Sequence, residues 1–564
     1  MRQHPRRWTA ATIPEAGRQL EEGGLPAWLA AMLARRGLST PQQVERWLEP
    51  SLDDLHDPAL LPDLALALDR LAAAREDGDA VAIVGDYDVD GITASAQYVA
   101  VFRACGLTVE PVLPHRHHEG YGFQPIHAER ARELGCSLIV TADCGSTSGP
   151  AVERARELGI DVIVTDHHLT TGELPVGTIE VNPARSDSQY PFPYLCAAGI
   201  AYKLSSVFAE RCGRSVPTES LLRMVCLGTI ADLVPLTGEN RTLATLGLQA
   251  LPDTPSPGLR ALLAAAGVDR PVTAEDVGFR LGPRLNAAGR MAAADSALEL
   301  LLTRDRQVAR ATAARLEEWN RDRRAAQREV TASAMEKWQQ VEDLPPILVG
   351  WNGEWHAGVV GISAGQVARH YHRPTLLLTV DGITAKGSGR SIPGIDLHAF
   401  LAPWAHRLVR FGGHQQAIGL TVDIEALPEL AAEWAESAKV EWPAEALERV
   451  FEYEWEFSPN ELDRELLTAL QRLEPFGVGN RRPLLRTGPL RLLGDAREFG
   501  EGHLKGSALT PAGHALALLG WRWAERAADL AGEFEALGYL EHDSYRDAPV
   551  FRLEDARPLD VASA

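Results

Sequence analysis

The spacing of hydrophobic residues changes along the chain, and each change predicts a different kind of structure. Up to about residue 77 the pattern is helical, with a break near Pro58 and Pro62. From there to about residue 235, short Val/Ile-rich runs such as AVAIVGD, SLIVTAD and DVIVTDHH alternate with amphipathic stretches such as PAVERARELGI. Near-continuous apolar strands joined by helices are typical of a parallel sheet that is covered on both faces. The sequence therefore predicts an α/β domain.

The remaining pattern predicts four further segments. Residues 236–303 are typical of small helices, and residues 305–342 contain neither Pro nor Gly, which predicts a helix about 50 Å long. Residues 346–440 resemble a second α/β unit, and from about residue 445 a spacing of two indicates a small antiparallel β domain. We therefore expect an N-terminal helical segment (1–77), an α/β domain (78–303), a connector helix (304–342), a smaller α/β domain (343–444) and a small antiparallel barrel or sandwich (445–564).

Composition narrows the class of protein. The 564 residues are 45% hydrophobic and 24% charged, which is typical of globular chains. The net charge of -21 argues against a general polyanion binder. Six cysteines without a CxxC pair argue against a zinc knuckle and a disulfide framework. With no run of about 20 apolar residues and no secretory signal, we expect a cytoplasmic protein that does not contact membranes. A monomer is the default expectation.

Carboxylates and histidines follow several of the apolar runs. Directly after such runs stand Asp86, Asp88 and Asp90 in GDYDVDG, Asp143 in TADCG, Asp166, His167 and His168 in TDHH, and Asp232 in GTIADLVPL. Each alone is also explained as a turn or helix-cap residue. Because the carboxyl ends of parallel strands lie at one edge of the sheet, we expect these side chains to converge.

The types of side chain indicate which ion would bind there. Asp and His without Cys suit a hard or borderline divalent ion, with Mn²⁺ the best fit and Mg²⁺ the alternative. The carboxylates suffice for two ions, and two ions about 3.5–4 Å apart activate water against a phosphoryl ester. The residues thus predict a metal-dependent phosphoesterase.

Several motifs in combination resemble a known family. GDYDVDG, TADCG, TDHH and GTIADLVPL are similar to the four successive motifs of the DHH phosphoesterase superfamily. RFGGHQQAIGL resembles the GGH motif of its companion DHH-associated domain, which assigns residues 78–303 and 343–444 to these two domains. Within the superfamily, PRLNAAGRM, EGYGF and KGSGRSIPGIDL resemble RecJ, a family of 5′→3′ exonucleases specific for single-stranded DNA. The resemblance covers about residues 45–560, and it contributes to the expectation of an OB-like barrel at 445–564.

The resemblance implies a role for each residue of the predicted metal centre. Two Mn²⁺ ions would be held by Asp86, Asp88, Asp90, Asp143, His167 and Asp232. Asp143 would bridge the ions, Asp88 would serve one with help from Asp86, and the other three would serve the second.

Three further residues would support catalysis. Asp166 would orient a histidine, while His168, and His414 from the companion domain, would lie near the scissile phosphate. Water would attack, so no protein nucleophile is expected, and Cys144 is interpreted as an inert thiol.

The same resemblance assigns DNA contacts. Ser388, Gly389 and Arg390 in KGSGRSI would form a pocket for the 5′-phosphate, with an ordinary Gly/Ser loop as the alternative. Backbone contacts would come from Arg116, Arg280, Arg284, Asn286 and Arg290, although Arg280 and Arg284 could equally form structural salt bridges. Trp521, Arg522 and Trp523 could stack on bases or, for the aromatics, fill the barrel core.

The predicted function is therefore a two-metal exonuclease that degrades single-stranded DNA from its 5′ end to mononucleotides in repair and recombination. A helicase and a single-strand-binding protein are the expected partners. The alternatives are a phosphodiesterase of short oligonucleotides or cyclic dinucleotides, and a non-catalytic scaffold. The connector helix and β domain oppose the first alternative, and the intact set of candidate ligands opposes the second.

Overall fold

The computed structural model describes residues 6–114, 122–169, 174–268, 271–291, 294–543 and 546–559. The chain forms two compact units. The smaller unit comprises Arg315–Phe451 with the short segments Met1–Thr9 and Arg290–Ala292, and the larger unit comprises Ala10–Gly289, Ala293–Ala314 and Glu452–Ala564.

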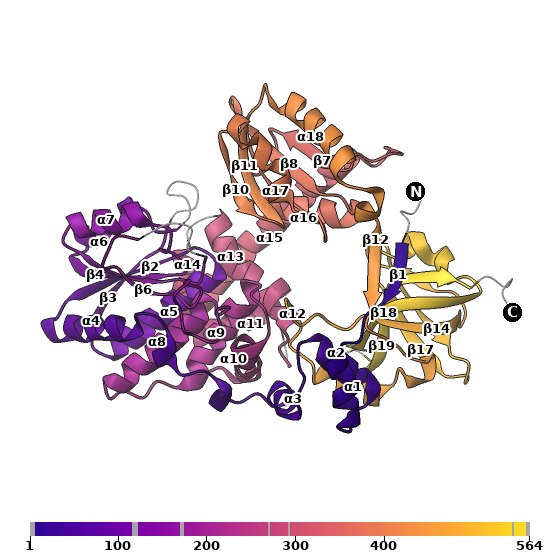
Figure 1. The fold of residues 1–564 in the computed structure, drawn as a ribbon, viewed down its shortest axis with the longest axis horizontal. Coiled ribbons are helices and arrows are strands. Elements are labelled where there is room, and N and C mark those ends of the chain that lie inside the picture. Colours follow the sequence, from indigo (N-terminus) through magenta and orange to yellow (C-terminus); the bar gives the residue numbers. More distant parts are fainter. Residues whose placement is uncertain are drawn as a thin grey trace. The chain divides into compact units, whose positions relative to one another are not determined.

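A five-stranded parallel sheet organises the first half of the larger unit (Figure 1), and its strand order is β3-β2-β4-β5-β6. The strands are β2 (Ala80–Gly85), β3 (Thr108–Val112), β4 (Cys136–Ala142), β5 (Asp161–Thr165) and β6 (Ile179–Val181). Strands β2, β4 and β5 are neighbours at the centre, with Ile83 opposite Val140 and Val140 opposite Ile163. This register brings the carboxyl ends of the three central strands together.

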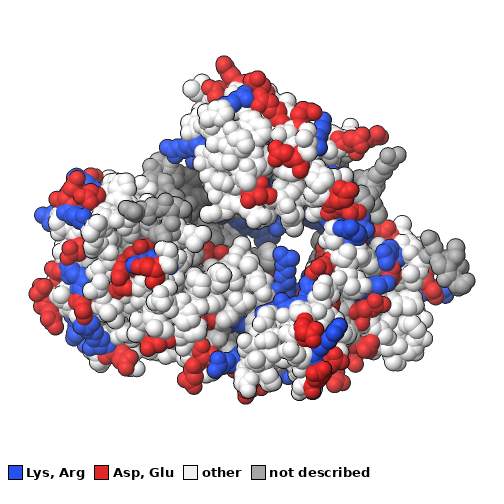
Figure 2. Space-filling view, viewed as in Figure 1, with Lys and Arg blue, Asp and Glu red and all other residues white. Residues whose placement is uncertain are grey.

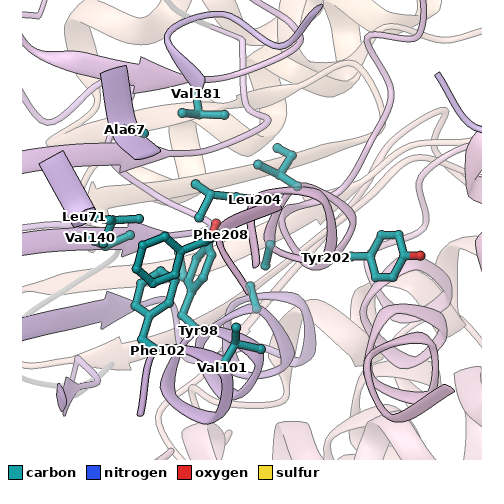
Figure 3. Close-up of a cluster of buried hydrophobic side chains, with 14 of the residues drawn as sticks. Ala67, Leu71, Tyr98, Val101, Phe102, Val140, Val181, Tyr202, Leu204 and Phe208 are labelled. Carbon is teal, nitrogen blue, oxygen red and sulfur yellow. The ribbon is translucent and has the colours of Figure 1, made fainter. Parts of the chain in front are cut away.

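Helices cover both faces of this sheet, as the near-continuous apolar strands predict. The helices are α4 (Leu64–Asp77), α5 (Val89–Ala104), α6 (Pro125–Glu133), α7 (Gly149–Glu157) and α8 (Ala197–Arg211). Helices α6 and α7 lie on one face, and α4, α5 and α8 on the other. Figure 3 shows aromatic rings of the second face packed together, with the Phe102 ring centroid 5.3 Å from those of both Tyr98 and Phe208.

A run of helices follows the sheet. They are α9 (Thr218–Ala231), α10 (Gly238–Ala250), α11 (Pro257–Ala266), α12 (Ala274–Asp276), the π-helical turn η4 (Val277–Leu281), α13 (Gly282–Met291), α14 (Asp295–Leu302) and α15 (Arg306–Glu336). The 31 residues of α15 correspond to about 45 Å. The predicted long helix is present, although it ends at Glu336 rather than near residue 342.

The smaller unit contains a five-stranded mixed sheet with the order β10-β11-β9-β8-β7. Its elements are β7 (Leu348–Asn352), α16 (Val360–Tyr371), β8 (Thr375–Asp381), β9 (Thr384–Arg390), α17 (Leu397–Leu401), β10 (Arg410–His414), β11 (Ala417–Asp423) and α18 (Leu427–Glu441). Its core is apolar and includes the fully buried Trp434 of α18. The second α/β unit expected from the sequence is therefore present.

Five strands near the C-terminus close into a ring in the order β14-β16-β17-β19-β18. The elements of this region are β12 (Arg449–Tyr453), β13 (Trp455–Glu456), α19 (Arg464–Gln471), β14 (Leu485–Leu492), β15 (Arg497–Phe499), β16 (His503–Leu509), β17 (Ala515–Gly520), the 3₁₀ helix η8 (Ala524–Leu530), β18 (Glu533–Asp543) and β19 (Ala548–Pro558). All pairs of the ring are antiparallel except β17–β19. A five-stranded ring of this kind is the architecture of an OB-fold, which confirms the predicted barrel.

The N-terminal segment is not wholly helical. Helices α1 (Glu15–Glu22), α2 (Ala27–Arg35) and α3 (Pro41–Leu48) are preceded by strand β1 (Arg6–Ala10). β1 pairs with β12, more than 400 residues later in the chain. Local propensity does not predict this strand because its partner is so distant in sequence. The three helices share one apolar core with the barrel, through residues such as Leu33, Trp47, Leu466 and Phe534.

Charges of both signs are interspersed on the surface that Figure 2 shows. None of the helices in the described part of the chain has the length and apolar character of a membrane span.

Candidate active site

The predicted acidic residues do converge where the central strands end. Asp86 follows β2, Asp143 follows β4 and Asp166 follows β5, and each is at most 2% exposed. The three strands are neighbours in the sheet, so their next residues meet at one edge, as expected for ligand sites in parallel sheets.

An unusual backbone conformation aims Asp143 into this cluster. Its φ is 69°, in the left-handed region that costs a non-glycine residue free energy and is concentrated at functional sites. The Asp143 amide donates to the carbonyl of Thr165 at 3.2 Å. The next strand thereby holds the strained turn in place.

The start of helix α5 contributes two more carboxylates. Asp88 is the N-cap and accepts hydrogen bonds from the amides of Asp90 (3.0 Å) and Gly91 (3.1 Å). Asp90 accepts from the amides of Ala197 (2.7 Å) and Ala198 (2.9 Å), the first two residues of α8. Two helix N-termini thus stabilise negative charge at this point.

His167 lies at the centre of the cluster. Its Nε2 atom is 3.0 Å from Asp143 Oδ1, 3.6 Å from Asp232 Oδ2 and 3.8 Å from Asp90 Oδ2. Asp232 reaches the cluster from the C-terminal cap of α9. The fourth motif therefore joins the three that follow strands.

Three overlapping groups of side chains have the spacing of metal ligands. In each group the candidate ligand atoms lie within 4.8 Å of one another, and the groups are Asp86/Asp88/Asp143, Asp143/His167/His168 and Asp90/His167/Asp232. Asp143 and His167 each belong to two of the groups. All six residues that were predicted as ligands are therefore brought together.

Electrostatics indicates that these residues suit a cation. Burial and the neighbouring carboxylates raise the pKa of Asp143 well above its ordinary value, that of Asp232 to about 9 and that of Asp90 to about 6. Burial and the nearby His168 lower the pKa of His167 to about 4, so its imidazole is neutral and can donate a lone pair to a metal. Oxygen ligands with one neutral imidazole fit Mn²⁺ or Mg²⁺.

His168 differs from His167 because it is paired with Asp166. Its Nδ1 atom lies 2.7 Å from Asp166 Oδ1, and its side chain is 40% exposed. Burial lowers the pKa of His168, but the hydrogen bond and the charge of Asp166 outweigh burial and raise that pKa to about 9. His168 is therefore an imidazolium at neutral pH, suited to contact an anion.

A buried network behind this pair was not predicted from the sequence. Ser146 donates its amide to Asp166 Oδ2 (2.9 Å) and its hydroxyl to Glu180 (2.6 Å). The Asn182 amide group donates to Ser146 Oγ and to the backbone carbonyl of His168, both at 3.0 Å. The only signal in the sequence is that Asn182 directly follows a short strand-like run, IEV, which itself contains Glu180.

Cys144 sits beside Asp143 but lacks the environment of a nucleophile. It is 2% exposed, and its Sγ lies 3.6 Å from the carbonyl of Val84. Burial and the nearby Asp166 raise the pKa of its thiol well above the ordinary value. The reactive thiolate is therefore disfavoured.

Beside the metal-ligand cluster is a cavity of about 200 Å³. Phe123, Gln124, Cys144, Asp166 and His168 are among the residues that line it. The imidazolium of His168 thus borders an open space that a substrate group can enter.

The candidate DNA contacts around PRLNAAGRM are in part occupied by the protein itself. Arg280 pairs with Asp276 at 2.9 Å and donates to the carbonyl of Ala266. Arg284 is buried and donates to the carbonyls of Arg280 and Ala265. Both arginines therefore bond within the local fold; Arg280 forms a salt bridge, as the structural alternative proposed, whereas the bonds of Arg284 described here go to backbone carbonyls.

The other residues of this segment have varied surroundings. Asn286 is half-buried on α13, and Arg290, in the smaller unit, donates to the carbonyl of Gly358. Phe279 in the π-helical turn is 78% exposed; π-helical turns are frequent at functional sites. Arg116 lies outside the described residues.

The predicted phosphate loop is instead a strand. Ser388, Gly389 and Arg390 belong to β9, which pairs with both β8 and β11. The Gly-rich composition misled the prediction: at Gly389 a Cβ would lie 2.5 Å from Leu376 and 2.7 Å from Ile418, so glycine is required by packing.

The side chains of Ser388 and Arg390 nevertheless lie beside the same residue, Gly361. A Cβ at Gly361, at the start of α16, would lie 3.1 Å from Ser388 Oγ and 3.2 Å from Arg390 Nη2. A hydroxyl, a guanidinium and a helix N-terminus therefore adjoin one another. His414 ends β10 and is exposed.

These features together define a DHH-type α/β protein with a companion domain and an OB barrel. The model of the DHH family, N-terminal domain, matches residues 80–229, that of the DHHA1 domain matches 344–439, and that of the RecJ OB domain matches 453–554.

Relatives and solved structures narrow the assignment. The chain is 36% identical to the single-stranded-DNA-specific exonuclease RecJ of Dickeya dadantii, over 87% of this chain and 88% of that protein. It is also 36% identical to RecJ of Bacillus subtilis over 81% of this chain, but spans only 58% of that relative's length. Crystal structures of RecJ from Thermus thermophilus with Mn²⁺ (TM-score 0.82, 30% identity) and with Mg²⁺ (0.78, 28%) match 99% of this chain, and 80% and 79% of theirs. The chain belongs to the RecJ family.

Proposed function

We propose that this protein is a two-metal 5′→3′ exonuclease that degrades single-stranded DNA to 5′-mononucleotides in repair and recombination. The observation that carries the proposal is the cluster at the sheet edge, where Asp143 and His167 are each shared between candidate ligand groups. The names of the relatives, all single-stranded-DNA-specific exonucleases, support the substrate.

We propose that two ions, with Mn²⁺ preferred, are held by the six residues predicted from the sequence. Asp143 is the proposed bridge because it belongs both to the group with Asp86 and Asp88 and to the group with His167. Bound ions of this kind activate water and stabilise the leaving oxygen of a phosphodiester.

The protein's own residues have distinct proposed roles in the reaction. His168, held as an imidazolium by Asp166, donates to a phosphate oxygen as negative charge develops on it. Ser146 and Asn182 fix this pair from behind. His414 is the proposed contribution of the companion domain near the same phosphate.

The polarity of the enzyme requires recognition of a 5′ end. We propose that Ser388 and Arg390, beside the start of α16, bind the terminal 5′-phosphate. A guanidinium can form two parallel hydrogen bonds with a phosphate, and the helix dipole adds to the attraction. Burial lowers the pKa of Arg390, but arginine stays charged at neutral pH.

Arg390→Ala tests the polarity proposal. The variant should lose about tenfold or more in kcat/KM on 5′-phosphorylated DNA and little on DNA with a 5′-hydroxyl, because it loses a charge-assisted pair of hydrogen bonds. Lys386→Ala, an exposed cation on the same strand, is the matched control. Equal discrimination between the two ends by Arg390→Ala and the native protein would place the phosphate elsewhere.

The overall proposal is tested by digesting a strand labelled at one end, with and without Mn²⁺, beside a blunt duplex. Stepwise release of mononucleotides from the 5′ end of the single strand alone is the expected result. Cleavage restricted to dinucleotides would favour the small-substrate alternative, and tight binding without metal-dependent cleavage would favour a scaffold.

The remaining proposals concern the domain boundaries, the cellular compartment, the protein partners and the contacts to the DNA backbone. We propose the domain division given above, a cytoplasmic monomer, and cooperation with a helicase and a single-strand-binding protein, which would supply and expose the substrate strand. Arg280, Asn286, Arg290 and Arg116 stay proposed contacts to the DNA backbone. Arg280 would need to exchange part of its present bonding to serve in this way.

A further inference from the structure

The chain turns directly after Asp232, one of the proposed metal ligands. Leu233 has a φ of 64°, in the left-handed region that residues with a side chain rarely adopt. The Leu233 side chain is 67% exposed, so its own packing does not hold the turn. A strained backbone conformation persists where surrounding contacts fix it. The residues that follow Leu233 must therefore hold the turn next to Asp232.

These following residues lie against a loop of the barrel domain. The loop comprises residues 473–480, between α19 and β14, and we call it the coupling loop. The Leu236 amide donates to the carbonyl of Val478 at 2.7 Å, and Leu236 is 2% exposed. Both segments belong to the larger unit. A hydrogen bond at a buried residue is costly to leave unmade, so this bond ties the segment after Asp232 to the coupling loop.

Two glycines let the coupling loop approach this segment closely. A Cβ at Gly477 would lie 2.7 Å from Leu236 Cδ1. Gly479 has a φ of 73°, and its Cβ would lie 3.2 Å from both Pro235 Cβ and Thr237 Cγ2. These distances are shorter than the optimal separation of two carbon atoms. The position of the segment therefore depends on the shape of the loop.

Hydrogen bonds fix the shape of the coupling loop. The backbones of Gly477 and Asn480 pair with each other at 2.9 and 3.2 Å. The Asn480 side chain is fully buried and donates to the carbonyls of Leu473 (2.7 Å) and Pro475 (2.8 Å). Its carbonyl oxygen accepts from Arg36 Nε, at the end of α2, at 2.6 Å. A buried polar network that is bonded in this way makes the loop a rigid surface.

Helix α10, which follows the segment, contacts the same loop. Arg241 of this helix is 2% exposed and donates to the carbonyls of Leu473 (3.0 Å) and Trp47 (3.1 Å). Its guanidinium lies 4.2 Å from the Trp47 ring centroid. Because a buried cation is costly without such bonds, the contact between α10 and the loop resists opening. The chain between Leu236 and Arg241 is therefore held against the coupling loop at both ends.

We propose that the coupling loop positions Asp232 for metal binding, so that the barrel domain shapes the metal centre without supplying a ligand. This inference rests on the proposed function. Asp232 belongs to the candidate ligand group with Asp90 and His167, so the ion held by that group is the one affected. A loop that only joined the two domains would leave metal binding unchanged.

The test is calorimetric titration of the full chain with Mn²⁺ alone, without DNA. Gly479→Ala places a methyl group against Pro235 and Thr237, so the loop must move away from them. The affinity for one ion should fall about tenfold, as is typical when the support of a ligand is lost, and that for the other should change less than about twofold. Gly494→Ala is the matched control, because Gly494 of the barrel has a φ of 74° but its added Cβ meets no atom within 4 Å. It should bind Mn²⁺ as the native protein does.

The Mn²⁺ dependence of cleavage provides a second measurement. Gly479→Ala should need about tenfold more Mn²⁺ for its half-maximal rate, and at saturating Mn²⁺ its kcat should lie within about threefold of the native value, because bound metal restores the position of Asp232. An Mn²⁺ affinity equal to that of Gly494→Ala, or a lower kcat with an unchanged Mn²⁺ requirement, would overturn the inference.

Leu236→Ala tests the same contact from the other side and decides the question if Gly479→Ala does not fold. It removes the side chain that lies against Gly477 and should also weaken the binding of one Mn²⁺ ion about tenfold. The control is Leu68→Ala, which truncates a buried leucine of α4 in the core beside the parallel sheet. It should lower the unfolding temperature without changing Mn²⁺ affinity. Equal Mn²⁺ affinities of the two leucine variants would overturn the inference.

Failure of the inference is separable from failure of the proposed function. If the native protein binds Mn²⁺ and digests single-stranded DNA, while Gly479→Ala and Leu236→Ala bind Mn²⁺ as their controls do, only the positioning role fails. If the native protein neither binds Mn²⁺ nor digests single-stranded DNA, the proposed function fails, and the positioning role fails with it.

Discussion

Asp143 combines a strained backbone, complete burial and a position shared by two candidate ligand groups. Asp143→Asn should reduce metal-dependent cleavage by more than about 100-fold. Losing a residue that only supports a metal ligand typically costs 10- to about 100-fold in activity, and Asp143 is itself a proposed ligand. The neutral amide also removes repulsion from Asp88 and Asp90, so the metal-free variant should unfold at a higher temperature than the native protein. Near-normal cleavage with Mn²⁺ would contradict the two-ion assignment.

Asp166 holds His168 in its charged form, which gives the reaction a pH limit. His168 has a raised pKa, about 9, so its useful protonated form is present below that pH and is lost as pH rises through it. In Asp166→Asn the pKa of His168 should fall, since burial is then opposed only by the charges of Asp232 and Asp90. The alkaline limb of kcat against pH should therefore move to lower pH by about one to two pH units.

The measurement for Asp166→Asn compares kcat from pH 6 to pH 9.5 with Mg²⁺, using Glu157→Gln as a control that removes a distant surface carboxylate. Superimposable alkaline limbs for the native protein and Asp166→Asn would contradict the role given to the pair.

At the scale of elements, the close approach of α9 to α5 and α8 positions Asp90. A Cβ at Gly228 of α9 would lie 2.6 Å from Asp90 Oδ1, from Thr93 Oγ1 and from Ala198 Cβ. Gly→Ala within a helix normally stabilises a protein by about 1 kcal/mol. Gly228→Ala should instead lower the unfolding temperature and reduce cleavage at least about tenfold, because either Asp90 or the helices must shift.

Gly278→Ala is the matched control for this substitution, since its added Cβ meets no atom within 4 Å. Thermal unfolding and cleavage rates of the two variants give the comparison. A stable, fully active Gly228→Ala would show that the helices are not held as closely as described.

At the scale of the whole molecule, buried carboxylates link stability to pH and metal. The pKa of Asp232 is raised from 3.8 to about 9, and that of Asp143 is also raised. Between pH 3.8 and about pH 9 the folded protein therefore binds more protons than the unfolded chain does. Stability of the metal-free protein therefore falls as pH rises across this window. Its unfolding temperature should be lower at pH 8.5 than at pH 6.

Mn²⁺ should reverse this loss, because it binds the folded site and competes with the protons. At about 100 times its Kd an ion adds about 2.7 kcal/mol to the stability of the folded state, and the gain in unfolding temperature should be larger at pH 8.5. In Asp232→Asn the contribution of this group disappears, so the pH dependence should be flatter. An unfolding temperature that changes neither with EDTA nor with Mn²⁺ would contradict the proposed metal site.

Much of the fold follows from local patterns. The apolar runs that end in Asp86, Asp143 and Asp166 predict parallel strands, and the spacing of two after residue 445 predicts antiparallel β structure. Elements whose partners are distant in sequence could not be predicted in this way: β1 forms only because β12 lies beside it. The glycines of β9 indicate a loop by composition, yet neighbouring strands require them for packing.

The sequence by itself determined the chemistry of this protein, because the identity and spacing of Asp and His at the ends of apolar runs are local properties. Tertiary structure alone decided which groups share an environment, since distances and burial depend on the packing of distant segments. It separated the neutral His167 from the charged His168, engaged Arg280 and Arg284 in the local fold, and buried Trp523 while leaving Trp521 in solvent. Adjacent residues of similar type thus acquire different roles through their surroundings.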